Sequence, residues 1–359
     1  MKKVLLDWLC CPTCREGLTL EVLEEADEVE AGALRCVGCA RMYPVIGGVP
    51  RMLPDALAHL VPPMHEAFFR RYAALMEPFL ARCRGDAPRE TATAAKRRTL
   101  QSYSYQWRKF KEMFPQWEAL FRWSVAPIAP AFFPGRVGLD AGCGYGRSLS
   151  YAASYGAQVI GLDLSEAVQA ARENTRHLPG AHVVQGDIYQ PPVRPATLDF
   201  VYSIGVLQHL PAPRQGFLGL TQLVRPGAPV FVWVYPRGRG RQIRLFTLMR
   251  HVSTRLPLRA VDALSLALAV GQWAFWIAPS RVLRRLGLSR LADAVPFSLY
   301  ARYPFRVLHA DWVDGLSVPL VNYYKAPEIV EWFRAAGLER IAMASPWDGR
   351  AIGYVADHR

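Results

Sequence analysis

The chain has 359 residues, and its 43 basic and 30 acidic residues give a net charge of +13 at pH 7. Hydrophobic residues make up 51% of the chain and charged residues 20%, a composition that excludes disorder as its main state. At about 150 residues per domain, this length predicts two domains or one large domain with an appendage. The positive charge favours anionic partners, such as nucleic acid, phosphorylated substrates or a membrane surface, without identifying one of them.

The N-terminal residues lack the pattern of an export signal. The apolar run at residues 4–6 ends at Asp7, and no small-residue cleavage site follows. The longest uncharged apolar run, residues 263–278, is shorter than the roughly 20 residues that a membrane-spanning helix needs. We therefore expect a cytoplasmic protein without a transmembrane span, whose seven cysteines are thiols or metal ligands rather than disulfides.

Four of the cysteines form two C-x-x-C pairs. Cys11 and Cys14 make the first pair and Cys36 and Cys39 the second, with 21 residues between the pairs. Two such turns point four thiolates at one ion, so the spacing predicts a closed, structural zinc site. A redox-active C-x-x-C is the alternative, although that function uses one pair in a thioredoxin-like context. Cys10 is adjacent to Cys11 and is an alternative ligand in the first pair.

The segments around these cysteines resemble a known family. LLDWLCCPTC, LRCVGC and the segment MYPVIGGVP at residues 42–50 are similar to a small zinc-ribbon protein. Bacteria encode that protein alone, and eukaryotes use it as the activator subunit of RNA and protein methyltransferases. The resemblance covers residues 1–55, which we assign to a zinc ribbon, and it implies an interaction or stability module rather than a catalytic one.

Residues 56–130 have a helical pattern and are predicted to form a linker or cap. Apolar residues recur three to four positions apart from Phe68 to Phe79, and residues 85–88, Gly-Asp-Ala-Pro, predict a break. Basic and aromatic residues alternate over residues 96–110. This stretch either binds nucleic acid through phosphate contacts and stacking or forms helices that cover the next domain.

A succession of strands and glycine-rich turns follows in residues 131–236. The segment VGLDAGCGYGR at residues 137–147 predicts a buried strand, an acidic end and a turn whose glycines let the backbone approach a ligand. Four more predicted strands, each separated by a helical pattern, indicate a parallel sheet with right-handed crossovers. A glycine triplet also occurs in dinucleotide-binding dehydrogenases, which remain a remote alternative on this motif alone.

The segments LDAGCGYGR, VIGLDLS, QGDI, SIGVLQHL and LVRPGAPVFV resemble, in this order, five motifs of the class I S-adenosylmethionine-dependent methyltransferases. The resemblance implies an α/β fold with a Rossmann-like, seven-stranded sheet and S-adenosylmethionine as cofactor. It also implies which residues contact the cofactor. Asp140 and the loop of Gly142, Cys143, Gly144 and Gly146 contact the methionine part, and Ser203 and Ile204 contact the methionine end. Asp163 and Leu164 contact the ribose, and Asp187 and Ile188 contact the adenine.

His209 follows the fourth strand at the carboxyl edge of the predicted sheet, where a general base could stand. Because a sulfonium cofactor is already activated, the protein needs no nucleophile of its own. The alternative is a histidine that orders its loop and packs beside the cofactor.

Residues 237–319 form a long insertion, which we predict to be a helical lid over an acceptor pocket. It begins with an Arg-Gly loop at residues 237–241 and contains Trp273, Phe275, Trp276 and an arginine cluster at residues 281–285. These features suit a phosphorylated or lipid-linked acceptor or a peripheral membrane contact, and the arginines equally suit RNA. An extra helical layer with ordinary core aromatics is the alternative.

Residues 320–359 are predicted to return to the core as a helix and two closing strands around Ile341 and Ile352. The helix resembles the last helix of bacterial small-molecule methyltransferases. His309, Asp314, Tyr323 and Tyr324 are candidates for contact with the acceptor, and the alternative is that they pack the lid against the sheet.

The expected function is methyl transfer to a small-molecule acceptor in secondary, lipid or glycan metabolism. An RNA methyltransferase is the alternative, since ribosomal RNA guanine methyltransferases share the order of zinc ribbon and class I domain. A catalytically silent cofactor-binding protein is a third hypothesis, which the intact glycines and acidic residues argue against.

Overall fold

The computed structural model describes residues 1–84, 94–238, 240–345 and 348–357. The predicted break at residues 85–88 and Arg239 of the predicted Arg-Gly loop lie outside the described residues. The chain divides into two compact units. We call Met1–Thr93, Trp117–Gly238 and Asn322–Arg359 the core unit, and Ala94–Gln116 and Arg239–Val321 the helical unit.

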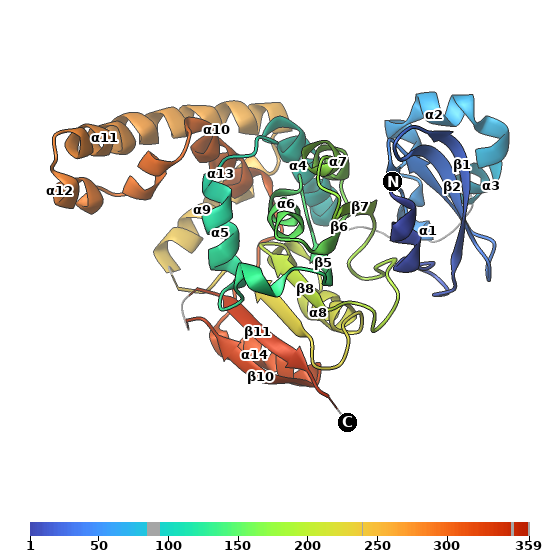
Figure 1. The fold of residues 1–359 in the computed structure, drawn as a ribbon. Coiled ribbons are helices and arrows are strands. Elements are labelled where there is room, and N and C mark those ends of the chain that lie inside the picture. The colour runs from blue at the N-terminus through green and yellow to red at the C-terminus, as the bar shows by residue number, and fades with distance from the viewer. Residues whose placement is uncertain (85–93, 239, 346–347, 358–359) are drawn as a thin grey trace. The chain divides into compact units, whose positions relative to one another are not determined.

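A four-stranded antiparallel sheet begins the core unit (Figure 1). After a short 3-10 helix, η1 (Lys3–Asp7), its strands follow in chain order: β1 (Leu18–Glu25), β2 (Val29–Cys36), β3 (Met42–Ile46) and β4 (Val49–Pro50). Four short helices follow: α1 (Asp55–Ala58), η2 (Pro62–Met64), α2 (Glu66–Arg71) and α3 (Ala73–Arg84). Every residue of β3 is buried, because Met42 and Ile46 share a hydrophobic cluster with Met76 and Phe79 of α3.

The two C-x-x-C pairs are matching turns at the end of this sheet. The amide of Arg15 donates to the Cys11 carbonyl at 2.9 Å, and the amide of Ala40 donates to the Cys36 carbonyl at 3.1 Å. Both donors have the left-handed backbone, with φ of 68° and 55°, that lets the chain turn away after the second cysteine of each pair.

The sulfurs of Cys11, Cys14, Cys36 and Cys39 lie within 4.8 Å of one another. The Sγ atoms of Cys11 and Cys39 are 3.6 Å apart, and those of Cys14 and Cys36 are 3.3 Å apart. Tetrahedral zinc with Zn–S bonds of about 2.3 Å needs sulfurs about 3.8 Å apart, so the cluster fits this ion. Cys10, the alternative ligand, is buried outside the cluster.

The predicted class I sheet is confirmed. Its seven strands are ordered β10-β11-β9-β8-β5-β6-β7, with β5 to β9 parallel and β10 and β11 antiparallel. The strands are β5 (Val137–Ala141), β6 (Gln158–Asp163), β7 (Ala181–Gln185), β8 (Phe200–Ile204), β9 (Pro229–Trp233), β10 (Leu338–Met343) and β11 (Arg350–Val355). The helices of this part are α5 (Gln116–Val125), η3 (Pro130–Phe132), α6 (Arg147–Ser154), α7 (Ala167–Thr175), η4 (Leu207–His209), α8 (Pro213–Thr221) and α14 (Ala326–Ala335). The parallel strands are buried almost throughout, as expected for a sheet that helices cover on both faces.

The zinc ribbon is bound to this sheet through a buried arginine. Arg51, directly after β4, is fully buried, and its guanidinium contacts Glu166 at 3.0 Å, Gln185 at 3.1 Å and Gln169 at 3.3 Å. Burial alone raises the pKa of Glu166, but the hydrogen bond from His65 and the charge of Arg51 lower that pKa to about 2. The amide of Met52 also donates to the Gln185 carbonyl at 2.8 Å, so the chain after the ribbon continues along the edge strand β7.

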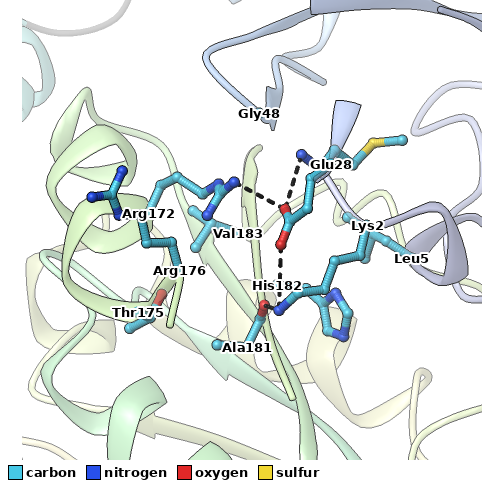
Figure 2. A pocket seen from close by; sticks show the side chains of 11 residues that line it. Lys2, Leu5, Glu28, Gly48, Arg172, Thr175, Arg176, Ala181, His182 and Val183 are labelled. Carbon is cyan, nitrogen blue, oxygen red and sulfur yellow. Dashed lines mark hydrogen bonds and ion pairs between the residues drawn. The ribbon is translucent and has the colours of Figure 1, made fainter. Parts of the chain in front are cut away.

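A second polar contact joins the ribbon to α7 and β7 (Figure 2). Glu28 accepts a hydrogen bond from Arg172 at 2.9 Å and lies 3.8 Å from the amine of Lys2. Lys2 donates to the carbonyls of Leu178 and Ala181, at 2.7 and 3.0 Å. Ribbon residues such as Leu5 and Leu9 share a hydrophobic cluster with the sheet, so the ribbon and the sheet have one continuous core.

The helical unit consists of α4 (Ala94–Lys109), α9 (Gly240–Ser253), α10 (Leu258–Gln272), the π-helix η5 (Trp273–Ile277), α11 (Ala278–Arg285), α12 (Ser289–Ala294), η6 (Ser298–Arg302) and α13 (Phe305–Ser317). Asp262 of α10 joins three of these helices. Its carboxylate accepts from Tyr105 at 2.7 Å, is paired with Lys109, and lies 3.0 Å from the His309 ring. Residues 96–110, predicted to bind nucleic acid or to cover the next domain, therefore contribute the side chains of Tyr105 and Lys109 to contacts within this unit.

The apolar run that seemed too short to span a membrane belongs to a longer helix. α10, η5 and α11 are continuous over Leu258–Arg285, and these 28 residues are long and apolar enough to cross a membrane by length and composition. Core helices of soluble proteins can meet the same criterion. Only 22% of the most apolar window is buried, however, so this helix differs from a typical core helix.

The buried arginine predicts a large effect on stability. We expect Arg51→Met to lower the free energy of unfolding by about 3–5 kcal/mol, because it leaves the Glu166 carboxylate without its buried cationic partner. Arg35→Met, which breaks the exposed pair with Glu21, should cost less than about 1 kcal/mol. Denaturant unfolding followed by fluorescence measures both, and similar losses in the two variants would contradict a special role for Arg51.

The cysteine cluster predicts about one zinc ion per chain. Cys36→Ser/Cys39→Ser should reduce the zinc content to near zero and lower the melting temperature, because a structural zinc site contributes its binding energy to folding. Cys10→Ser should keep the zinc, since Cys10 lies outside the cluster. Metal analysis of protein purified without chelator tests both expectations, and undiminished zinc in the double variant would rule out this site.

Candidate functional site

The carboxyl ends of the parallel strands gather the residues that the resemblance assigns to the cofactor. Asp140 lies within β5 and Asp163 ends β6, while Asp187 follows β7 and Ser203 lies near the end of β8. Ligands of open α/β sheets bind at this edge, next to the point where the strand order reverses. That point lies between β5 and β8 in this sheet.

The glycine-rich turn after β5 is held open by its backbone. Gly142, Gly144 and Gly146 have φ of 88°, 54° and 89°, values that side-chain-bearing residues rarely adopt. The amides of Gly142 and Cys143 both donate to the Leu162 carbonyl, at 2.7 and 3.0 Å. A Cβ on Gly142 would lie 2.4 Å from a methyl group of Val206, so only glycine fits between this turn and the loop after β8.

Asp163 ties the turn to β6. One carboxylate oxygen accepts from the Gly144 amide at 2.9 Å, and the other accepts from the amide and hydroxyl of Ser165 at 2.8 and 2.7 Å. Burial raises the pKa of this carboxyl although these hydrogen bonds favour its ionised form. The side chain is therefore held in one orientation at the strand end.

Asp140 is the least satisfied acid of the site. It is 2% exposed, and its Oδ2 atom has no hydrogen-bond partner among the described residues. Burial, followed by the nearby Asp163 carboxylate, raises the pKa of Asp140 to about 8. An unsatisfied buried carboxylate beside a glycine turn fits a cationic ligand, and S-adenosylmethionine carries both a sulfonium and an ammonium group.

The other predicted cofactor residues lie along the same edge. Asp187 accepts from the Tyr189 amide at 3.0 Å, and Ile188 beside it is buried. The Ser203 hydroxyl donates to the Ala141 carbonyl at 2.9 Å, joining β8 to β5, and Ile204 follows it. The Leu164 carbonyl accepts from the Gln185 amide group at 3.1 Å.

Two of the five candidate residues, the predicted base His209 and the acceptor candidate Tyr323, meet a common aromatic neighbour. The His209 ring stands edge-on to Tyr235, with centroids 5.5 Å apart, and Tyr323 is tilted against the same ring at 6.0 Å. Tyr324 instead packs edge-on against Trp332 of α14 at 4.7 Å, and burial raises its pKa to about 12. His309, bound to Asp262, and Asp314 lie in α13 of the helical unit.

Three residues at this edge escaped the sequence analysis: Gln208, Trp233 and Tyr235. Trp233 contacts Tyr235 at 5.8 Å between ring centroids and lies 3.3 Å from where a Cβ of Gly205 would stand. Gln208 is fully buried, and neither its amide oxygen nor its amide nitrogen has a partner among the described residues. Trp233 ends β9 and Tyr235 follows it at the carboxyl edge, as His209 follows β8, but an aromatic residue at a strand end does not by itself indicate a site.

Backbone hydrogen bonds fix the chain segment that carries Tyr323. The amide of Asn322 donates to the Gln208 carbonyl and that of Tyr324 to the Tyr235 carbonyl, both at 2.9 Å. The amide of Arg237 donates to the Tyr324 carbonyl at 2.8 Å. We call His209, Trp233, Tyr235 and Tyr323 the aromatic wall, and these hydrogen bonds hold its parts in register.

Comparisons with known proteins match the two regions of the chain that carry the glycine turn and the cysteine cluster. The Methyltransferase domain family matches residues 139–232, and the Trm112p-like protein family matches residues 2–48. These matches cover the glycine turn and the cysteine cluster.

Curated relatives match parts of the chain. A 37.1 kDa protein in transposon TN4556 of Streptomyces fradiae is 39% identical over 26% of this chain and 28% of its own length. A ubiquinone biosynthesis O-methyltransferase from Leptothrix cholodnii is 28% identical over 49% of this chain and 77% of its own length. A tRNA U34 carboxymethyltransferase from Sodalis glossinidius is 32% identical over 36% of this chain and 41% of its own length. The chain thus spans less than half the length of two of these relatives.

Two solved structures resemble this one at low identity. A complex of the Haloferax volcanii Trm112 methyltransferase activator with a putative methyltransferase has a TM-score of 0.42 at 14% identity, covering 73% of this chain and 97% of that one. The magnesium protoporphyrin IX methyltransferase of Synechocystis, with bound SAH, has a TM-score of 0.38 at 15% identity, covering 83% of this chain and 98% of that one.

The assignment of the two domains rests on observations other than those two structures. These are the strand order, the glycine turn, the cysteine cluster and the two family matches. The chain therefore carries a class I S-adenosylmethionine-dependent methyltransferase domain, preceded by a Trm112p-like zinc-ribbon domain.

Proposed function

We propose that this protein transfers a methyl group from S-adenosylmethionine to a small-molecule acceptor that lies against the aromatic wall. The observation that carries the proposal is the shared contact of His209 and Tyr323 with Tyr235, beside the buried amide group of Gln208. A wall of rings with one unsatisfied polar group suits a compact acceptor with a flat apolar part and a hydrogen-bonding group.

The residues of the chain divide the task. Asp140 and the glycine turn bind the charged methionine part, and Asp163 holds the ribose hydroxyls. The bound cofactor supplies an activated methyl group, so the protein must orient the acceptor and receive its proton. His209 is the residue that we assign to that proton, because it lies in η4, shortly after β8, and belongs to the aromatic wall.

The names of the relatives leave two acceptor classes. Three of them are ubiquinone biosynthesis O-methyltransferases, which favours a small molecule, and one is a tRNA U34 carboxymethyltransferase, which favours RNA. The aromatic wall of the core unit supports the small molecule, because its rings and the buried amide group of Gln208 suit a flat acceptor. One exposed cation, Arg237, lies at the wall and donates to the Tyr323 carbonyl at 3.1 Å.

The direct test is to follow the methyl group. The pure protein is incubated with methyl-labelled S-adenosylmethionine and an extract of its source organism, and the label is separated by solvent partition and by RNase sensitivity. We expect label in small or organic-soluble molecules. Label that disappears only after RNase treatment would overturn the proposal in favour of RNA.

Two variants test the roles of His209 and Gln208 in this assay. His209→Asn should lower kcat and remove the acidic limb of its pH profile, the fall in rate at low pH, while the dissociation constant for the cofactor stays within about twofold. Gln208→Ala should mainly raise KM for the acceptor, because its amide group binds rather than reacts. Undiminished transfer by His209→Asn would contradict the assigned proton acceptor without affecting the small-molecule proposal.

Asp140 gives a prediction that does not need the acceptor. Asp140→Asn should weaken S-adenosylmethionine binding by about 10- to 100-fold, because a neutral amide replaces the carboxylate that faces the cationic ligand. Isothermal titration calorimetry measures the affinity. Asp7→Asn, which changes an exposed aspartate, is the control. Equal affinities for the wild type and Asp140→Asn would contradict this role.

Asp140→Asn should lower the cofactor affinity but raise the stability of the cofactor-free protein at high pH. Because the folded state holds the Asp140 proton up to a pKa of about 8, the free energy of unfolding should fall as pH rises from about 4 to 8. Asp140→Asn should lack this loss and should be more stable than wild type at pH 9.

A further inference from the structure

The exposed apolar side chains of this protein are concentrated in one part of the chain. Among the described residues, twenty large hydrophobic side chains are exposed, and fifteen of them lie between Leu245 and Leu299. All fifteen belong to the helical unit. Single exposed apolar residues are ordinary, but such a concentration marks a surface that binds something apolar.

These side chains form faces on the helices rather than scattered points. Leu245, Leu248, Val252 and Leu256, in α9 and the turn after it, follow one another at intervals of three, four and four residues and are 36–68% exposed. This spacing places them on one side of the helix. We call this set the α9 stripe.

The helix Leu258–Arg285 has one buried and one exposed side. Val261, Ser265 and Ala269 are fully buried at intervals of four residues. Val270, on another side, is 50% exposed, and Phe275 of η5 is 77% exposed. The apolar side chains continue through Val282, Leu286 and Leu291 into α12.

The net positive charge of the protein also lies in the helical unit. The helical unit holds 18 of the 43 basic residues and 5 of the 30 acidic residues, so it carries a net charge of +13. The rest of the chain holds 25 residues of each sign and has no net charge. Arg285, Arg290 and Arg302 are exposed, and none of them forms an ion pair with a carboxylate of the described residues.

We propose that the helical unit docks on the surface of an anionic lipid membrane. The α9 stripe and the exposed side of Leu258–Arg285 enter the boundary between headgroups and acyl chains, while the arginines contact the lipid phosphates. Apolar side chains flanked by arginines are typical of helices that lie in a membrane interface. Each arginine near such a surface adds to the attraction.

The structure favours lipid over the other occupants of this surface. RNA would neutralise the arginines but would leave the α9 stripe exposed to water. A second copy of the chain would cover the stripe but would bring two units of +13 together.

Insertion of Leu258–Arg285 across the bilayer would break its contacts within the helical unit. Those contacts are Asp262 with Tyr105 and Lys109, and the indole of Trp312 with Gln272 at 2.6 Å. The proposal concerns only where the protein binds, so it stands apart from the identity of the methyl acceptor.

Flotation of the full-length protein with vesicles tests the proposal. Vesicles of phosphatidylcholine alone are compared with vesicles that contain 30% phosphatidylglycerol, at roughly 50 and 500 mM salt. We expect flotation with the anionic vesicles and its loss at high salt. Leu248→Ser/Phe275→Ser and Arg285→Gln/Arg290→Gln should each weaken vesicle binding by about tenfold or more.

Matched substitutions in the core unit test whether vesicle binding depends on this surface or only on the total charge and hydrophobicity of the protein. Val22→Ser/Met64→Ser removes two exposed apolar side chains, and Arg70→Gln/Arg214→Gln removes two exposed cations. Both control variants should float like the wild type. Cofactor affinity, measured for every variant, verifies that each one is folded.

Several results would overturn the proposal. One is equal vesicle binding by all four double variants, and another is flotation that is independent of anionic lipid. Tight binding of RNA without any flotation would assign the surface to RNA. A stable dimer in light scattering that Leu248→Ser/Phe275→Ser converts to monomer would assign it to a second copy. Retention in the membrane after alkaline carbonate extraction would indicate a spanning helix.

Discussion

A buried guanidinium joins the two folded parts of the core unit, together with the Arg172–Glu28 contact and a shared hydrophobic cluster. Arg51 is fully buried, and a charge in that position is stable only with its partners in place. Those partners are Glu166, at the start of α7, and Gln185, at the end of β7. Asp163 precedes Glu166 by three residues and Asp187 follows Gln185 by two, so the ribbon is fixed to the two segments that carry the predicted ribose and adenine acids.

Local sequence patterns were sufficient for the elements that carry the two sites. Each parallel strand is a short apolar run that ends near a polar or glycine-rich turn, and the two C-x-x-C pairs specify four thiolates within one small sheet. Arg51 could not be found in this way, because an arginine after a proline has the composition of a surface residue. Its burial depends on Gln185 and Glu166, which are more than 100 residues away. Trp233 and Tyr235 were missed for a related reason, since aromatic residues at the end of a strand have the same pattern whether they line a pocket or a core.

The helical unit shows the limit of counting residues along the chain. The uncharged run at residues 263–278 gave a length that excluded a membrane span, but the helix continues through Arg259 and Asp262 at one end and Arg281 at the other. Asp262 lies near the N-terminus of α10 and pairs with Tyr105 and Lys109 of α4. Residues 94–109 therefore belong with the insertion, although more than 120 residues separate the two segments. No pattern within either segment predicts the other.

The net charge of +13 resides in the helical unit. The side chains that surround these cations decide what the unit binds. In a stretch that binds single-stranded nucleic acid, exposed cations alternate with rings on which bases stack. In α4, which has that composition, Tyr103 and Trp107 stack on each other at 6.1 Å, and Lys109 is paired with Asp262. Arg285, Arg290 and Arg302, which form no ion pair with a carboxylate of the described residues, lie instead in the same stretch of chain as exposed leucine, valine and phenylalanine side chains. Charge next to apolar surface matches the chemistry of a lipid interface, whose phosphates and acyl chains lie a few ångströms apart.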